Sequence, residues 1–182
     1  EDEAALRAFA ASVDVITYEF ENVPTSALDL LESLKPIRPN RRALAISQDR
    51  ISEKSFLNNL GLQTAPWSAV NSEADLRAAA ETLGLPAILK TTRLGYDGKG
   101  QVKLESAADI PAAWGAMNNA TCVLEGFVSF DREVSVIAAR GLDGSVACFD
   151  PGENIHRDGI LRTTSVPARL SPAQASDAVL LA

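Results

Sequence analysis

A glycine-rich loop between two short apolar segments constrains the fold of this chain more than any other feature. Residues 85–90 read Leu-Pro-Ala-Ile-Leu-Lys, which predicts a short buried strand that ends in a cation. Apolar residues alternate again over 102–104, which predicts a returning strand. Between them lie three glycines: Gly95, Gly98 and Gly100. We therefore expect a β-hairpin that carries a glycine loop.

Such a hairpin is suited to folding over a phosphate chain. Glycines let backbone N–H groups approach an anion, and Lys90 and Lys99 supply positive charge. The pattern is not a Walker A loop, which needs Ser or Thr after its Gly-Lys and leads into a helix. A hairpin turn with incidental lysines remains the alternative at this point.

The composition limits the class of protein. The 182 residues fit one ordinary domain or two small lobes, and 46% hydrophobic with 23% charged residues is typical of a soluble globular chain. A net charge of −7 argues against a general nucleic-acid or anionic-membrane binder. Cys122 and Cys148 fall in predicted strands, and we favour two reduced core thiols of a cytosolic protein over a disulfide.

Both ends of the sequence lie inside amphipathic helical patterns. The chain has no initiating Met, and residues 179–182 form an apolar run in a helix that opens at Ser171-Pro172. We expect the sequence to be part of a longer polypeptide.

The segments before the loop predict alternating helices and strands. A β-branched strand is expected over 13–18, with Glu19 at its carboxyl end, where ligands of parallel sheets gather. Glu19 is either a ligand-facing or a plainly solvated carboxylate. Asn40 is a helix cap, and a second helix starts at Ser47 or Gln48. A strand over 66–70 and a helix over 72–83 follow, as does a later helix over 107–118 with Trp114 and Met117 in the core.

Charged residues interrupt two of these segments. Arg50 and Lys54 lie one turn apart on a shared helix flank, a pattern that most often marks solvated surface. Glu125-Gly126 interrupts an apolar strand over 122–128, where a carboxylate is unfavourable unless something satisfies it. Three further strands over 132–139, 145–149 and 160–166, joined by a turn at 141–144 and a connection at 153–159, predict an antiparallel sheet.

Five ordered blocks of this sequence resemble the ATP-grasp enzymes, and among them the N5-carboxyaminoimidazole ribonucleotide synthetases. The blocks are residues 17–24, 48–54, 87–90 with 95–101, 125–133 and 153–156. The resemblance implies an α/β (α+β) fold, an ATP-grasp fragment that follows the end of a Rossmann-like pre-ATP-grasp domain. It implies three parts: the pre-ATP-grasp part over 1–39, a small lobe with the glycine lid over 40–124, and the start of a large lobe over 125–182.

The resemblance also implies site residues. Arg50 and Lys90 would contact ATP, Glu133 would hold the ribose hydroxyls, and His156, the one histidine of the sequence, would lie near the nucleotide. The lid over the triphosphate would be Gly95, Tyr96, Asp97, Gly98, Lys99, Gly100 and Gln101. The hinge strand that reads the adenine edge would be Glu125, Gly126, Phe127 and Val128. The catalytic residues would be Lys90 and Glu19, and the acceptor substrate would be contacted by Tyr96, Asp97 and Lys99.

The implied reaction consumes ATP, bicarbonate and 5-aminoimidazole ribonucleotide and gives ADP, phosphate and the N5-carbamate. The family's Mg²⁺ carboxylates would lie beyond Ala182, so no metal ligand is assigned in this sequence. We expect the chain alone to be catalytically inactive and to bind MgATP weakly or not at all. The resemblance further implies a cytoplasmic homodimer for the full-length protein.

Two alternatives remain on the sequence alone. Other ATP-grasp ligases of purine synthesis, such as the formate-dependent glycinamide ribonucleotide transformylase, share the hinge and the lid but use another acceptor. A non-catalytic nucleotide-binding module that has kept the fold is the second alternative.

Overall fold

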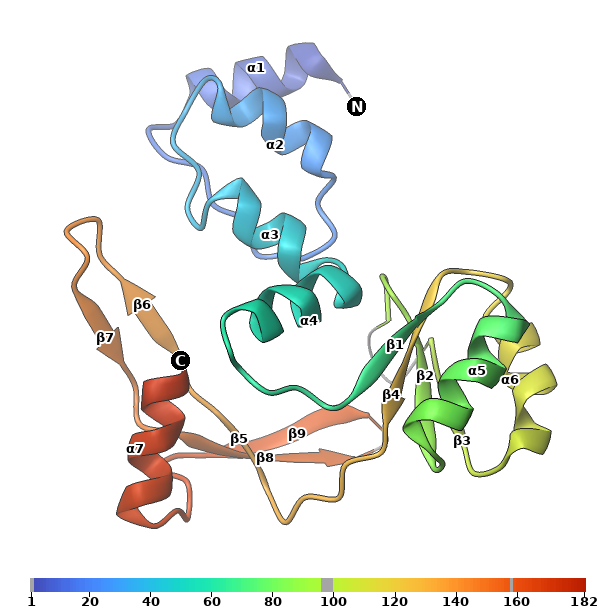
Figure 1. Ribbon diagram of the computed structural model, residues 1–182. Helices are drawn as coiled ribbons and strands as arrows, with labels where there is room; N and C mark the ends of the chain where they lie inside the picture. The colour runs from blue at the N-terminus through green and yellow to red at the C-terminus, as the bar shows by residue number, and fades with distance from the viewer. Residues whose placement is uncertain (1, 96–99, 158) are drawn as a thin grey trace. The chain divides into compact units, whose positions relative to one another are not determined.

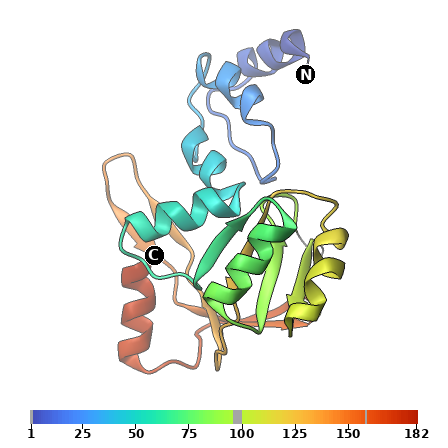
Figure 2. The ribbon, with the colours of Figure 1, turned by 45° about the vertical axis from the view of Figure 1, so that its right-hand side comes forward.

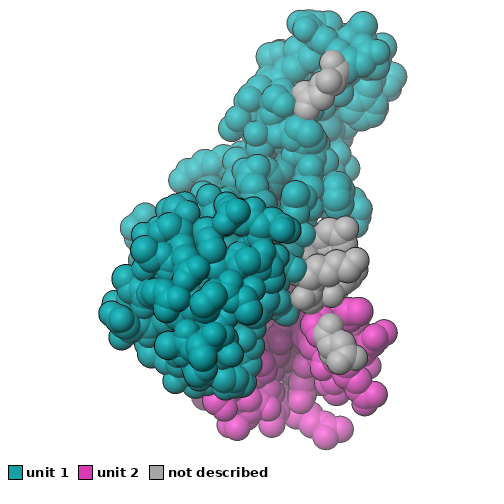
Figure 3. All heavy atoms as spheres, turned by 90° about the vertical axis from the view of Figure 1, so that its right-hand side faces the viewer, with its two compact units in different colours: residues 1–95, 100–126 teal, residues 96–99, 127–182 magenta. Residues whose placement is uncertain are grey.

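The computed structural model of the chain describes residues 2–95, 100–157 and 159–182. It divides into two compact units, residues 1–95 with 100–126 and residues 96–99 with 127–182, which are coloured teal and magenta in Figure 3. No helix in the described part of the chain is long and apolar enough to cross a membrane.

The first unit begins with four helices, shown in Figure 1 as α1 (Glu3–Ala11), α2 (Thr25–Glu32), α3 (Arg41–Ser47) and α4 (Arg50–Asn59). Asn40 caps α3, as expected, because its side chain accepts a hydrogen bond from the Ala43 amide. The cap of α4 is Asp49 rather than Ser47 or Gln48, since Gln48 still belongs to the end of α3. Six buried apolar residues form the core here: Ala10, Ile16, Leu28, Leu31, Ile37 and Leu44.

The strand expected over residues 13–18 is not present, and this prediction was wrong. Ile16 makes only an isolated parallel bridge to Ile37, in which the Ile16 amide donates to Pro36 and the Arg38 amide donates to Ile16, both over 2.9 Å. The partner segment begins and ends with proline, and proline has no N–H to donate to a ladder. A longer pairing is therefore prevented by the partner, although the β-branched pattern itself is favourable.

A four-stranded antiparallel sheet follows, in the order β1-β4-β2-β3. Its strands are β1 (Trp67–Val70), β2 (Ala87–Thr91), β3 (Gln101–Leu104) and β4 (Cys122–Gly126). The β2–β3 hairpin confirms the two strands predicted around the glycine loop. Lys90 pairs with Gln101 at the loop end of this hairpin.

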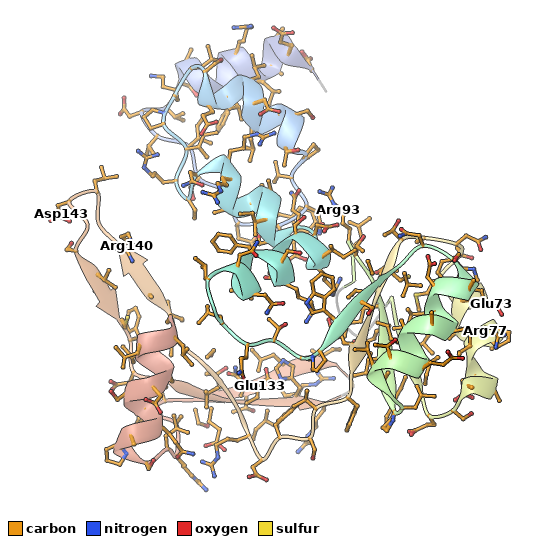
Figure 4. The ribbon with its side chains drawn as sticks, in the orientation of Figure 1. Glu73, Arg77, Arg93, Glu133, Arg140 and Asp143 are labelled. Carbon is orange, nitrogen blue, oxygen red and sulfur yellow. The ribbon has the colours of Figure 1, made fainter. Side chains whose placement is uncertain are left out.

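Helices cover one face of this sheet, as Figure 2 shows for α5 (Glu73–Leu83) and α6 (Ile110–Ala116). The short 3-10 helix η1 (Ala107–Asp109) precedes α6. Ser72 caps α5, and Gly84 ends it with a φ of 79°. The sheet and helices bury one contiguous apolar cluster, in which Met117 is buried and Trp114 is partly buried, as predicted. On the solvent side of α5, Glu73 and Arg77 form an ion pair one turn apart (Figure 4).

The alternation of side chains along β2 and β4 determines which residues lie on the face of the sheet away from α5 and α6. Ala87 and Leu89 of β2 and Cys122 and Leu124 of β4 belong to the core under the helices. Because successive side chains point to opposite faces, Lys90 and Glu125 lie on the face away from α5 and α6. The strand register pairs Glu125 with Ile88, two residues from Lys90 on the same face.

The second unit contains a three-stranded sheet, a hairpin and a helix. The sheet has the order β5-β8-β9, with β5 (Glu133–Ser135), β8 (Gly152–Arg157) and β9 (Ile160–Ser165), and the hairpin pairs β6 (Ala138–Arg140) with β7 (Val146–Cys148). α7 (Pro172–Leu181) opens with a Ser171–Gln174 capping box. Antiparallel pairing and the α7 start confirm the sequence prediction.

Two details of this unit differ from the prediction. Residues 153–159 were expected to connect strands, yet Glu153 to Arg157 lie in the central strand β8. The polar composition of β8 concealed it, because this strand is stabilised by ladders on both sides rather than by a buried face. The strand expected over 132–139 is divided into β5 and β6, which pair with different partners.

Both cysteines are free thiols, but only one is a core residue. Cys122 is fully buried in β4, and burial raises the pKa of its thiol. Cys148 is exposed at the end of β7, so the prediction of a core position was wrong for it. The two-stranded hairpin offers no second layer of its own under which Cys148 could be buried.

We predict that Gly100→Ala destabilises the first unit more than a glycine replacement at an open position. Gly100 has a φ of 69°, and an added Cβ would lie 2.7 Å from the Thr91 Oγ1 atom. Gly61 is the matched control, since its φ is 82° and nothing lies within 4 Å of its added Cβ. Urea unfolding should show Gly100→Ala to be about 2 kcal/mol less stable than Gly61→Ala. Equal losses would mean that Thr91 accommodates the methyl group.

Candidate functional site

A carboxylate held between two lysines lies on the helix-free face of the four-stranded sheet. Glu125 Oε2 accepts from Lys90 Nζ over 2.9 Å, and Glu125 Oε1 lies 3.2 Å from Lys54 Nζ. The three side chains come from β4, β2 and α4, so the cluster joins the sheet to the helix. This arrangement answers the question that the sequence raised about a carboxylate in an apolar strand.

The cluster is largely withdrawn from solvent. The exposed fractions of the side chains are 10% for Glu125, 13% for Lys54 and 23% for Lys90. Burial by itself raises the pKa of Glu125, but hydrogen bonds and charge interactions with Lys90 and Lys54 more than reverse this, and the pKa lies below its ordinary value of 4.5. Glu125 is therefore held as a carboxylate at neutral pH.

A second carboxyl group adjoins the cluster. Burial raises the pKa of Glu53 on α4 above its ordinary value, while Arg50 and Lys54 act in the opposite direction and the charge of Glu125 adds to the increase. The charged groups gathered here are three cations and two carboxyl groups: Arg50, Lys54, Lys90, Glu53 and Glu125. The site therefore carries one positive charge in excess when both carboxyl groups are ionised, which favours an anionic ligand.

Arg50 connects the start of α4 to the base of the glycine hairpin. Its guanidinium donates to the carbonyl oxygens of Thr91 and Gly95, each over 2.8 Å, and its backbone amide donates to Thr92 over 3.0 Å. A planar guanidinium can bridge two carbonyls in this way, whereas an ammonium lacks the fixed fork. Arg50 is thus not the solvated surface residue that its spacing most often marks.

The described part of the glycine loop consists of its two ends. The Thr91 amide donates to the Gly100 carbonyl over 2.9 Å, and the Thr91 hydroxyl donates to Arg93. Gly95, Gly100 and Gln101 lie at the loop end of the β2–β3 hairpin. The expected lid and substrate residues Tyr96, Asp97, Gly98 and Lys99 lie outside the described residues.

The expected hinge begins in regular structure and continues beyond it. β4 ends at Gly126, whose amide donates to the Pro66 carbonyl over 2.8 Å. Phe127 and Val128 are not in a strand and are about half exposed, at 47% and 48%. The boundary between the two compact units falls at this point of the chain, after Gly126.

In the second unit the structure brings together the two expected nucleotide residues. Glu133 of β5, labelled in Figure 4, and His156 of β8 lie on paired strands, with His156 Nδ1 3.3 Å from Glu133 Oε2. Arg132 also lies beside the Glu153 carboxylate of β8, at 3.8 Å. The carboxylate of Glu133 can accept from hydroxyl groups, and the imidazole of His156 can donate to a polar ligand.

One expected catalytic residue, Glu19, is not part of such a cluster. Glu19 is exposed in the irregular segment between α1 and α2. Among residues 2–95, 100–157 and 159–182, no group of three or more His, Cys, Asp or Glu side chains could hold a metal ion.

Sequence reasoning missed one member of the cluster. Lys54 was recognised beside Arg50 on one helix flank but was not assigned to the site. The signal was its spacing of four residues from Arg50, which places both on the same side of α4. The sequence did not show that β4, which carries Glu125, packs against this side of α4.

Models of protein families match nearly all of the chain. The ATP-grasp domain matches residues 55–182, and the ribonucleotide synthetase preATP-grasp domain matches residues 1–48. The chain belongs to the ATP-grasp family, with the α/β architecture that the sequence predicted.

Within this family the chain is similar to N5-carboxyaminoimidazole ribonucleotide synthases. The chain is 56% identical over 173 residues to the N5-carboxyaminoimidazole ribonucleotide synthase of Brucella melitensis, covering 94% of this chain and 48% of that protein. It matches the crystal structure of the ADP complex of an N5-carboxyaminoimidazole ribonucleotide synthetase with a TM-score of 0.94, 39% identity and coverage of 100% and 48%.

A third match is the Aspergillus clavatus N5-carboxyaminoimidazole synthase in complex with ADP and 5-aminoimidazole ribonucleotide. Its TM-score is 0.89 at 28% identity, and the match covers 100% of this chain and 47% of that one. The chain thus spans about half the length of the relatives it matches.

We predict that Glu125→Gln destabilises the chain at neutral pH and that this difference disappears in acid. The lowered pKa of Glu125 means that its ionised form is favoured by folding, so its contribution is complete above about pH 4.5, the ordinary value. The contribution is lost as the pH falls through the lower pKa of the folded state. Removing the carboxylate also leaves two buried lysines without their partner, at a cost of about 3 kcal/mol.

Urea unfolding of both proteins between pH 7 and pH 3 measures this difference. The control is Glu105→Gln, which removes an exposed carboxylate from its pair with Lys103 and should change stability by under about 1 kcal/mol. A constant difference between Glu125→Gln and wild type across the range would contradict the prediction.

Proposed function

We propose that this chain is the nucleotide-binding portion of an enzyme that carboxylates 5-aminoimidazole ribonucleotide with bicarbonate, at the expense of ATP, in purine biosynthesis. The observation that carries the proposal is the cationic cluster of Arg50, Lys54 and Lys90 at the base of a glycine hairpin. The relatives that share this sequence at 56% and 39% identity are synthases and synthetases of that product.

Lys90 and Arg50 are the residues that we assign to the phosphates of ATP. Phosphoryl transfer is promoted mainly by positioning and by neutralising charge on the phosphate oxygens. Lys90 lies near the end of β2 where the glycine loop begins, and Arg50 holds two carbonyls, of Thr91 and Gly95, on the β2 side of that loop. Residues 95–101 would close over the triphosphate, with glycines allowing their amides to approach it.

The remaining contacts to the nucleotide are assigned to residues of the two lobes. Residues 40–124 form the small lobe, residues 125–182 start the large lobe, and residues 1–39 belong to the domain before them. The backbone of Glu125, Gly126, Phe127 and Val128 would read the adenine edge, since backbone groups at a strand end supply both a donor and an acceptor. Glu133 would accept from the ribose hydroxyls, and His156, 3.3 Å away, would lie beside the nucleotide.

The contacts to the acceptor substrate are assigned to the lid loop and to the pre-ATP-grasp part. Tyr96, Asp97 and Lys99 would bind 5-aminoimidazole ribonucleotide, and Glu19 would face it from the pre-ATP-grasp part. In the reaction a bicarbonate oxygen attacks the γ-phosphorus of ATP, and ADP leaves. The carbon of the resulting carboxyphosphate is then captured by the amine, directly or after release as CO₂, and phosphate leaves. A closed lid protects this water-labile intermediate.

The proposal includes Mg²⁺ as the partner of ATP but assigns it no ligand in the described residues. It also includes a homodimeric state and a cytoplasmic location, in line with the family resemblance. Two free thiols are compatible with a reducing compartment.

The test is phosphate release by the complete gene product that contains this chain. With MgATP and bicarbonate, we expect 5-aminoimidazole ribonucleotide to stimulate phosphate release and glycinamide ribonucleotide not to. Lys90→Met should lower kcat/KM by about a hundredfold or more, because it removes a charged contact to the transferred phosphate. Arg7→Met, on the exposed pair with Glu3 in α1, is the control.

The outcomes separate the alternatives. Stimulation by glycinamide ribonucleotide alone would assign the chain to the transformylase branch. Nucleotide binding without turnover with either acceptor would identify a non-catalytic nucleotide-binding module.

A further inference from the structure

The Glu125 carboxylate has two lysine partners where one would satisfy the requirement for a counter-ion. Lys90 donates to Oε2 and Lys54 lies against Oε1, so each oxygen has its own ammonium partner. Lys54 is the more buried lysine, with 13% of its side chain exposed against 23% for Lys90. Under the proposed function Lys90 has a second task, because it must also reach a phosphate.

These two tasks of Lys90 conflict if Glu125 depends on Lys90 alone. A carboxylate that is one-tenth exposed and loses its only counter-ion is strongly destabilised. A nucleotide that draws Lys90 away would then bind with the corresponding loss of affinity. Lys54 removes this conflict, because its ammonium remains on Glu125 when Lys90 moves.

The charge around Glu125 supports an incoming anion rather than a purely structural pair. Glu125 interacts with Lys90 of β2 and Lys54 of α4, and the neighbouring Glu53 interacts with Arg50, Lys54 and Glu125. Three cations oppose two carboxyl groups, and Arg50 donates to neutral carbonyls. A structural ion pair would be better balanced without the third cation, since excess buried charge is unfavourable.

We infer that Lys54 is a positioning residue, which keeps Glu125 paired so that Lys90 can leave it for a nucleotide phosphate. This inference rests on the proposed nucleotide site but not on the identity of the acceptor. Lys54 itself makes no contact with the nucleotide in this account, and it acts through Glu125 and Lys90.

The test measures MgADP affinity by isothermal titration of the complete gene product and its variants. Lys54→Met should weaken MgADP binding about tenfold, because Lys90 must then leave a buried carboxylate without a partner. Glu125→Gln should bind MgADP at least as tightly as wild type, since the competing charge is gone. The double variant Lys54→Met/Glu125→Gln should recover affinity to within about threefold of wild type by the same reasoning.

Two controls separate positioning from structure. Lys54→Arg retains a cation at Glu125 and should bind MgADP like wild type. Lys103→Met makes the same replacement in an exposed pair with Glu105 and should leave affinity unchanged. Thermal unfolding should show that the double variant is no more stable than Lys54→Met, so its recovered affinity cannot come from recovered folding. In turnover, Lys54→Met should raise the KM for ATP more than it lowers kcat.

Wild-type affinity in Lys54→Met, or a double variant that stays as weak as Lys54→Met, overturns the inference. If wild type itself does not bind MgADP, both this inference and the proposed function fail. If the affinity pattern holds but 5-aminoimidazole ribonucleotide does not stimulate phosphate release, only the proposed reaction fails.

Discussion

The first unit depends on one buried carboxylate, that of Glu125, which joins the four-stranded sheet to helix α4. Glu125 of β4 holds Lys90 of β2 and Lys54 of α4, so a single side chain fixes three elements on one face of the sheet. The opposite face of the sheet packs its apolar side chains against α5 and α6. The helix-free face can therefore remain charged, because the ion pairs supply there the cohesion that packing supplies on the other side.

Arg50 extends this charged face to the glycine hairpin. Its two hydrogen bonds to Thr91 and Gly95 tie the helix start to the β2 side of the loop. The ends of the loop are thereby held by the Arg50 guanidinium and by the hydrogen bond from the Thr91 amide to the Gly100 carbonyl. An anion-binding loop needs such polar anchoring, since its own residues must keep their amides available for the ligand.

The sequence predicted the β2–β3 hairpin, α3, α5, α7 and the antiparallel character of the second unit, because each rests on a local pattern. It failed where a segment's structure depends on its partner. Residues 13–18 have strand propensity but face a proline-bounded segment, whereas residues 153–157 are polar yet form a central strand between two ladders. Cys148 was misplaced for the same reason, since its hairpin has no covering layer.

For the site, the sequence by itself determined the residue types and their order: a cation at a strand end, a glycine loop, a carboxylate in an apolar strand and the resemblance to ATP-grasp enzymes. Alternation places Lys90 and Glu125 opposite the apolar positions of their own strands, and the pairing of β2 with β4 then puts both on one face of the sheet. Only the tertiary structure decided that this face meets α4, which makes Lys54 the second partner of Glu125 and Arg50 the anchor of the loop. The physical reason is that helical spacing defines a flank, while the packing of distant segments decides what that flank contacts.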